Sequence, residues 1–347
     1  MSQALQHVCD EIVRAAVAED QVFGELLPRL MQESQNEPPA ELNAALPRLA
    51  EGIAEAPPNL GGWLAVVAGS WVENGADAGR AGTAVVERLV EVTAAALAFG
   101  DAWEKAGAGD PPDMEQDQPS QQALDVVLPE LGEGGVTAMM SWFSLHQFAM
   151  AACTMLSRSP MVRASVEERE FRVFAAGQAA KYLGQMAYVR DLLQVLDGER
   201  LLVLDRASRQ GWTVTISGIG DNFQLHTLLA GALQGRPGGM PGEPPAPEIV
   251  ASFLDTDLPS KQIVTSPWNL VDAKGEWIYN EGVPADIPAL NGTRVVVLDP
   301  PSYSRSFPAG RRFPLMPATL TIEGMHLAED LTEWWPHIAP ANNPNTG

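Results

Sequence analysis

The side chains best suited to binding an anion lie together in one short stretch of a strongly acidic chain. Residues 291–316 contain one acid, Asp299, and four arginines, although acidic side chains outnumber basic ones by 44 to 22 in the whole sequence. These arginines are Arg294, Arg305, Arg311 and Arg312. A guanidinium presents a planar set of donors that matches a carboxylate or a phosphate. Together with Tyr303, the arginines of residues 305–312 predict an anion-binding loop.

The alternative for these arginines is pairing within the protein. Because acids are twice as numerous as bases, each guanidinium can find a carboxylate of the same molecule. Pro308, Gly310 and Pro314 flank the arginines and restrict the shapes that the loop can adopt. The sequence therefore leaves both interpretations open, an anion-binding loop and a loop whose arginines are paired internally.

Two residues are candidates for proton transfer. His226 lies in the segment "DNFQLHTLL", in the first turns of an expected helix, where an imidazole can act as a general base. Asp299 ends the strand-like run "RVVVLD" and offers a carboxylate. The alternative for His226 is a partly buried structural side chain. No two of the five histidines have the i, i+2 or i, i+4 spacing of a local metal motif, so no metal site is predicted.

The stretch "VVVLDPPSY" resembles the Asp-Pro-Pro loop of adenosylmethionine-dependent methyltransferases that act on bases. The resemblance implies that Asp299 holds the amino group being methylated and that Tyr303 stacks on a flipped base. It also implies alternating strands and helices with a Gly-rich cofactor loop, for which Gly218 and Gly220 in "VTISGIGDNF" are the available residues. The match covers about nine residues of 347. The same residues leave open a plain strand that ends in a proline turn.

Charge and composition restrict the partners and the cellular setting. A net charge of −22 repels phosphates and anionic lipids, which disfavours nucleic acids and membrane surfaces and favours a basic or neutral partner. The basic residues are 18 Arg and only 4 Lys, as in GC-rich bacterial genomes. Cys9 and Cys153 are too few for a disulfide framework, and the first residues lack the pattern of a signal peptide. We therefore expect a cytoplasmic bacterial protein.

Residues 135–157 contain no Asp, Glu, Lys or Arg and are long enough to span a bilayer. Several polar side chains, among them Ser141, His146 and Gln147, make the segment a poor candidate for membrane insertion. A helix that is apolar on all sides is also what the centre of a large helical domain needs. We therefore predict a buried central helix rather than a membrane contact.

Local patterns divide the chain into two domains. Residues 1–200 are predicted to be helical, with an acidic loop at 107–120, the central helix at 135–157 and a long helix over 165–197. Ser165 and Glu168 have the spacing of a capping box that would begin the long helix.

The second predicted domain covers residues 201–338 and is followed by a flexible tail at 339–347. Its β-rich runs alternate with Gly- and Pro-rich loops, and the predicted strands include "IVASFLD" and "EWIYN". A last helix is predicted at "HLAEDLTEWWPHI". The expected fold class is α+β, with an all-helical domain first and then a loop-rich domain that has a small mixed or antiparallel sheet and a few helices.

These features favour an accessory or adaptor protein that binds a protein or peptide partner. The sequence contains no P-loop, zinc-protease motif or nucleophile elbow. It also contains no motif that predicts a cofactor or an oligomeric state. The alternative is an enzyme of another family with a pocket between the two domains, including the methyltransferase that the Asp-Pro-Pro loop suggests.

Overall fold

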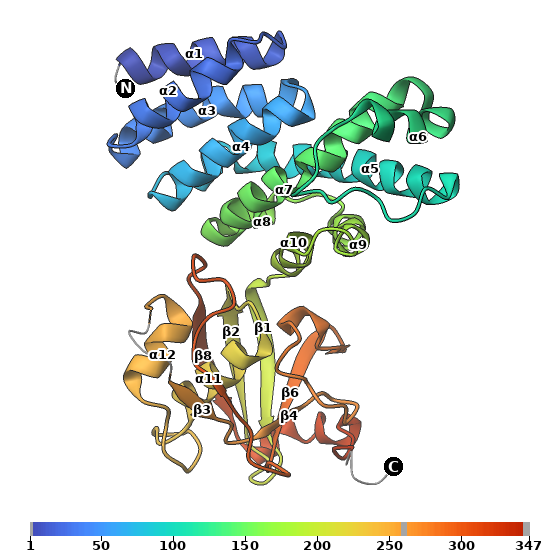
Figure 1. Cartoon of the computed structure of the whole chain (residues 1–347). Helices are drawn as coiled ribbons and strands as arrows, with labels where there is room; N and C mark the ends of the chain where they lie inside the picture. The colour runs from blue at the N-terminus through green and yellow to red at the C-terminus, as the bar shows by residue number, and fades with distance from the viewer. Residues whose placement is uncertain (1–2, 258–261, 343–347) are drawn as a thin grey trace. The chain divides into compact units, whose positions relative to one another are not determined.

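The chain forms two compact units, Met1–Leu193 and Gln194–Gly347, and each is considered by itself (Figure 1). The structure is a computed structural model and describes residues 3–257 and 262–342. The first unit is helical, and the second combines a small mixed sheet with a few helices. The α+β class expected from the sequence, with the helices first and the sheet after them, is confirmed.

Helices α1 to α10 build the first unit. Short 3-10 helices at Ala78–Arg80 and Gly132–Gly134 precede α5 and α7. The α-helices are α1 (Gln3–Val17), α2 (Phe23–Ser34), α3 (Pro39–Glu55), α4 (Pro58–Glu73), α5 (Gly82–Ala106), α6 (Gln121–Leu131), α7 (Gly135–Arg158), α8 (Pro160–Ala164), α9 (Arg169–Ala179) and α10 (Gln185–Leu193).

The uncharged segment is the central helix of this unit, α7. It is buried along most of its length and packs against α4 and α5. Small residues permit this packing: a Cβ added to Gly69 on α4 would lie only 3.4 Å from the Cα of Ala151 on α7. None of the described helices is both long enough and apolar enough to cross a membrane.

The prediction of one long helix over 165–197 is wrong. Two helices, α9 and α10, occupy this stretch, and a strand begins at Asp197. Ser165 lies at the end of α8, where its hydroxyl donates to the carbonyl of Val162 at 3.0 Å instead of capping a following helix. Glu168 has a φ of +46°, which interrupts a right-handed helix. The capping-box spacing therefore occurs here at the end of a short helix and in the turn after it.

The second unit is built around a mixed sheet with the strand order β4-β6-β1-β2-β8, and β5 pairs with β6. Strands β1 and β6 are parallel, and the other pairs in this sheet are antiparallel. Strands β3 and β7 form a separate antiparallel pair. The elements are β1 (Asp197–Asp205), β2 (Gly211–Ser217), α11 (Asn222–Leu233), α12 (Pro247–Leu254), β3 (Ile263–Thr265), β4 (Asn269–Val271), β5 (Ala289–Leu290), β6 (Thr293–Asp299), β7 (Ser306–Pro308) and β8 (Thr319–His326), with 3-10 helices at Pro284–Asp286, Ala328–Leu331 and Trp335–His337.

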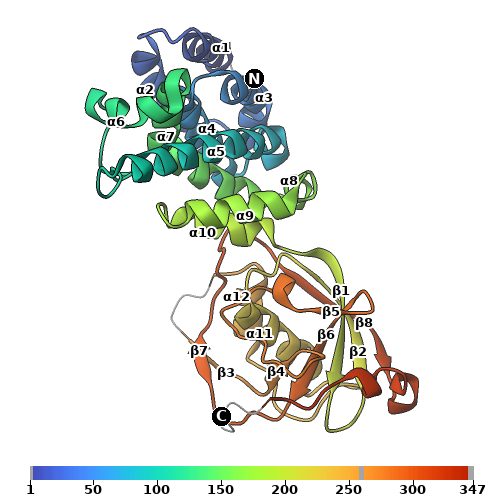
Figure 2. The same ribbon diagram turned by 90° about the vertical axis from the view of Figure 1, so that its right-hand side faces the viewer.

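The two faces of this sheet are covered by different segments. Helices α11 and α12 lie beside the sheet in Figure 2. Leu201 and Val203 on β1 belong to the core that contains residues of these two helices. The intervening Leu202 and Leu204 belong to a second core that contains Leu331 and the other apolar residues of the C-terminal segment. Both faces of β1 are therefore buried, as its nearly continuous apolar sequence requires.

Three predicted elements differ from the structure. The segment "IVASFLD" lies in helix α12, which Pro247 begins at the first helical position. "EWIYN" contributes only an isolated bridge between Trp277 and Val271. The last predicted helix consists of two 3-10 helices. Because β1 and β6 are the one parallel pair among the described strands, the alternation of strands and helices implied by the methyltransferase resemblance is not found.

The predicted flexible tail is attached to the fold over residues 339–342, whereas 343–347 lie outside the described residues. The amide of Ala339 donates to the carbonyl of Ala273 at 2.9 Å, and that of Asn342 donates to the carbonyl of Gly275 at 2.8 Å. The indole of Trp277 donates to the carbonyl of Asn342 at 2.9 Å. The predicted tail is therefore wrong for these four residues.

Shortening the chain tests this attachment. A protein that ends at Ile338 should unfold more easily than one that ends at Asn342, by about 2 kcal/mol, because several hydrogen bonds of about 0.5–1.5 kcal/mol each are lost. Thermal and urea denaturation of the two proteins measure the difference. Coincident unfolding curves would show that residues 339–342 do not stabilise the α+β unit.

Candidate functional site

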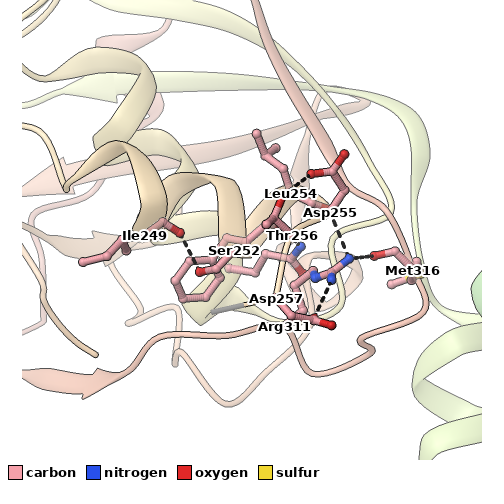
Figure 3. A network of polar contacts seen from close by, with 10 residues as sticks. Ile249, Ser252, Leu254, Asp255, Thr256, Asp257, Arg311 and Met316 are labelled. Atoms are coloured by element: carbon pink, nitrogen blue, oxygen red, sulfur yellow. Dashed lines mark hydrogen bonds and ion pairs between the residues drawn. The ribbon is translucent and has the colours of Figure 1, made fainter. Parts of the chain in front are cut away.

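Arg311 is held inside the α+β unit (Figure 3). Its side chain is only 5% exposed, and its Nη2 lies 3.2 Å from Oδ1 of Asp257. Its Nη1 also donates to the carbonyls of Leu254 and Met316, at 3.4 and 3.2 Å. These contacts tie the loop after β7 to the end of α12. Arg311 therefore already has structural partners, as the internal-pairing alternative requires.

Arg294 is likewise engaged within the unit. Its Nε lies 3.2 Å from Oε1 of Glu199, and its Nη1 donates to the carbonyls of Ala285 and Ile287. These contacts hold the 3-10 turn at 284–286 against the first residues of β6. Arg294 is therefore fixed by one carboxylate and two carbonyl groups of the same unit.

Asp299, a predicted catalytic candidate, is also paired. Its Oδ1 lies 2.5 Å from Nε of Arg206, whose Nη2 donates to the carbonyl of Ala339. Its Oδ2 is buried and has no hydrogen bond with the residues that the structure describes. The β4–β6 register places Asp299 directly opposite Asn269.

The charge of Arg312 acts on Asp221 near the start of α11. Asp221 caps this helix, accepting from the amide of Gln224 at 2.8 Å. Burial raises the pKa of Asp221 to about 6, although the hydrogen bond from Gln224 and the positive charge of Arg312 act in the opposite direction. The guanidinium of Arg312 also lies 5.7 Å from the ring centroid of Phe313.

Arg305 has a different environment from Arg294 and Arg311. Its Nη2 donates to Oδ1 of Asn269 at 2.6 Å, and its guanidinium lies 5.3 Å from the ring centroid of Trp277 and 5.6 Å from that of Tyr303. Over residues 3–257 and 262–342 it forms no ion pair with a carboxylate. Arg305 is half-buried and Tyr303 is 54% exposed, so the group can be reached from solvent. We call these four residues the Arg305 site.

His226 lies in the core close to this site. Its side chain is 1% exposed, and its ring stacks on Trp268 with a centroid distance of 6.1 Å. Burial lowers the pKa of His226 to about 4; the Asn280 amide opposes this effect, and the positive charge of Arg305 adds to it. Although Asn280 is near enough to influence the ring, neither ring nitrogen has a hydrogen bond of normal geometry with the described residues.

Other buried polar atoms around His226 also lack partners. Oδ1 of Asn222, Oδ1 of Asn280 and Oγ of Ser266 are all buried and form no hydrogen bond with the described residues. We call these three residues and His226 the buried polar cluster. An unpaired buried polar group costs about 1–3 kcal/mol, so such atoms are usually satisfied by protein, water or a ligand.

Three segments bring the buried polar cluster together. Asn222 and His226 are four residues apart on one side of α11. The loop that contains Asn280 runs along the start of this helix, since the amide of Phe223 donates to the carbonyl of Asn280 at 3.1 Å. The amide of Ser266 donates to the carbonyl of Arg305 at 2.9 Å, which joins the cluster to the Arg305 site.

This arrangement is better suited to binding than to proton transfer. His226 is neutral at pH 7 because its pKa is about 4, and its ring is enclosed by the core. Among the described residues no three His, Cys, Asp or Glu side chains are placed to hold a metal ion. Arg305 is a half-buried cation that solvent can reach, and its carbonyl accepts from the amide of Ser266 in the buried polar cluster.

Tyr303, Arg305 and His226 were predicted from the sequence, whereas most of their neighbours in the structure were not. Ser266, Asn269, Trp277 and Asn280 all come from the single segment "SPWNLVDAKGEWIYNEG". Its alternation of tryptophan, tyrosine and asparagine is unusual for a strand, and this signal could have marked it as part of a binding site.

Comparison with known proteins identifies no relative: no family model, no curated protein and no solved structure matches this chain.

The environment of His226 predicts a pH-dependent stability. Its pKa of about 4 lies below the value of about 6.5 in an unfolded chain, so the unfolded state binds more protons between these two values. The stabilising contribution is fully present above pH 6.5 and is lost as the pH falls to 4. Relative to His226→Gln, the wild type should lose about 3 kcal/mol over this window, measured by urea denaturation. A constant difference between the two proteins would contradict the buried environment.

Asp221 predicts the opposite behaviour. Its pKa of about 6 lies above the ordinary value of 3.8, so the folded state binds more protons between these two values. Stability is therefore lost as the pH rises from 3.8 to 6, and the full loss persists above pH 6. Asn caps helices as well as Asp does. Asp221→Asn should therefore be more stable than the wild type at pH 7.5, by up to about 3 kcal/mol, and equally stable near pH 4. The prediction fails if the variant is less stable at pH 7.5.

Proposed function

We propose that this protein is an accessory or adaptor protein that binds a protein or peptide partner through an acidic group held at the Arg305 site. The observation that carries the proposal is the environment of Arg305. Arg294 and Arg311 of the same stretch each have a carboxylate partner, whereas Arg305 has an amide and two aromatic rings. In a chain with twice as many acids as bases, such an arginine is free to take a carboxylate from elsewhere.

The Arg305 site is prepared for an oxyanion. Asn269 holds one nitrogen of the guanidinium at 2.6 Å, which limits its freedom before a ligand arrives. The rings of Trp277 and Tyr303, whose centroids lie 6.2 Å apart, flank the cation and exclude water from part of its surface. A carboxylate can then accept two parallel hydrogen bonds from the remaining donors, the strongest arrangement available to arginine.

The buried polar cluster is enclosed by the core, so a ligand is expected at the exposed groups of the site, Arg305 and Tyr303. The net charge of −22 favours a single acidic group on a peptide over a polyanion such as nucleic acid.

The proposed setting is the cytoplasm of a bacterium. The excess of Arg over Lys supports the bacterial origin. Cys9 and Cys153 are free thiols, and burial raises the pKa of each to about 12, which suits inert structural cysteines in a reducing compartment.

Selection from a display library of random peptides tests the binding proposal. The full-length wild type, Arg305→Gln and Arg200→Gln serve as baits; Arg200 is the matched control because it loses the same charge from an exposed pair with Glu323. Peptides enriched on the wild type and on R200Q should carry Asp, Glu or a free terminal carboxylate. They should bind R305Q at least ~10-fold more weakly, since a charge-assisted hydrogen bond contributes about 1.5–3 kcal/mol.

The enriched peptides allow a second comparison. Exchanging their acidic residue for Asn or Gln should weaken binding to the wild type as much as R305Q does and should have no further effect on R305Q. Arg305→Lys should retain part of the affinity, because it keeps the charge and loses the planar fork. Peptides that bind R305Q as tightly as the wild type would overturn the proposal.

A further inference from the structure

A groove lies on the helical unit between α2 and α4. It has a volume of about 510 Å³, within the ~300–1,000 Å³ range that is typical of ligand-binding clefts. Residues on or just after α2, among them Leu27 and Met31, form one wall, and residues on or just after α4, among them Trp63, Val67 and Ser70, form the other. The groove is distinct from the Arg305 site, which belongs to the α+β unit.

The packing of the first four helices leaves this groove open. α1 packs against both α2 and α3, and α3 packs against α4. Residues 63, 66, 67, 70 and 71 of α4 follow the spacing of one helical face, and residues 27, 31 and 34 do the same on α2. Two helix surfaces therefore border a channel that none of the neighbouring side chains fills.

Large apolar side chains are exposed in this groove. Met31 is 59% exposed and Trp63 is 45% exposed, one on each wall. Trp is the residue most often found as a binding hot spot, and flexible Met side chains adapt to the partner's surface. Gln32, Ser70 and Asn74 supply hydrogen-bonding groups at the edges. This mixture is typical of a groove that accepts the apolar face of a helix.

The negative charge of the helices near the groove favours a partner helix that is positively charged. Residues 19–77 contain ten acidic side chains and two arginines. Both arginines are neutralised locally, Arg29 by Glu11 and Arg48 by Asp10 and Glu51. The surroundings are therefore strongly negative, so an acidic helix is repelled and a basic one is attracted.

From this combination we infer that the α2–α4 groove docks a basic amphipathic helix of a partner protein. Its apolar residues would fill the space between Met31 and Trp63, which the uncharged lining of the groove suits. Its Lys and Arg side chains would be attracted by the excess of acidic residues in the surrounding stretch 19–77. A second copy of this chain fits less well, because its own strongly negative surface would be repelled. The inference is independent of the proposed function of the Arg305 site.

Fluorescence anisotropy with a designed peptide tests the inference. The probe is a labelled peptide of about 18 residues in which Leu occupies one helical face and Lys the other positions. It is compared with a peptide of the same composition whose Leu and Lys order has no helical periodicity, and with one that has Glu in place of Lys. The full-length wild type should bind the first peptide at least ~10-fold more tightly than either control.

Variants of the full-length protein locate the binding. Trp63→Ala and Met31→Ala remove exposed side chains and should each weaken the first peptide by ~10-fold or more. Phe171→Ala, which also removes an exposed aromatic ring of the helical unit, and R305Q should bind as the wild type does.

Three results would overturn the inference. One is equal binding of the periodic and non-periodic Lys peptides, which would mean attraction by charge alone. Another is wild-type affinity in both Trp63→Ala and Met31→Ala. The third is self-association of the wild type in sedimentation experiments that Trp63→Ala abolishes, which would make a second copy the occupant.

Discussion

Pairing between guanidinium and carboxylate groups determines which surfaces of this protein can bind. Acids are in twofold excess, so an arginine that lies near a carboxylate is neutralised and takes a structural role. Arg206 joins β6 to the C-terminal segment through Asp299, and Arg311 joins the loop after β7 to α12. Arg305 differs because the polar group nearest to it is the neutral amide of Asn269. Local pairing, rather than the number of arginines, therefore distinguishes Arg305 from the arginines that hold segments of the fold together.

The parts of the fold that were predicted correctly are those in which the local sequence pattern is compatible with only one kind of structure. An uncharged stretch of more than twenty residues had to be buried, and α7 is the central helix. Where two rules competed, the sequence was ambiguous. The short apolar run of α12 suits a strand as well as a helix, and the Ser165–Glu168 spacing suits a turn as well as a cap.

The candidate site was only half predictable for a related reason. The Arg and Tyr residues of the loop were visible because they contrast with the composition around them. Asn269 and Asn280 are ordinary residues in a loop-rich segment, and they gain significance only because the fold places them beside Arg305 and His226. A sequence specifies such neighbours through strand register and loop path, which no local pattern reveals.

The two proposed binding surfaces depend on electrostatics of different range. The helical unit has 27 acidic and 12 basic residues, so many charges act together and can attract a basic partner from a distance. The α+β unit has 17 acidic and 10 basic residues, and Arg305 must attract an anion against this excess. At physiological salt, a single charge acts weakly beyond the screening length of about 8 Å. The attraction between one arginine and a ligand anion therefore exceeds the repulsion from the surrounding acids only when the two groups are in direct contact. Recognition at Arg305 therefore requires a close fit, which its amide and aromatic neighbours are placed to provide.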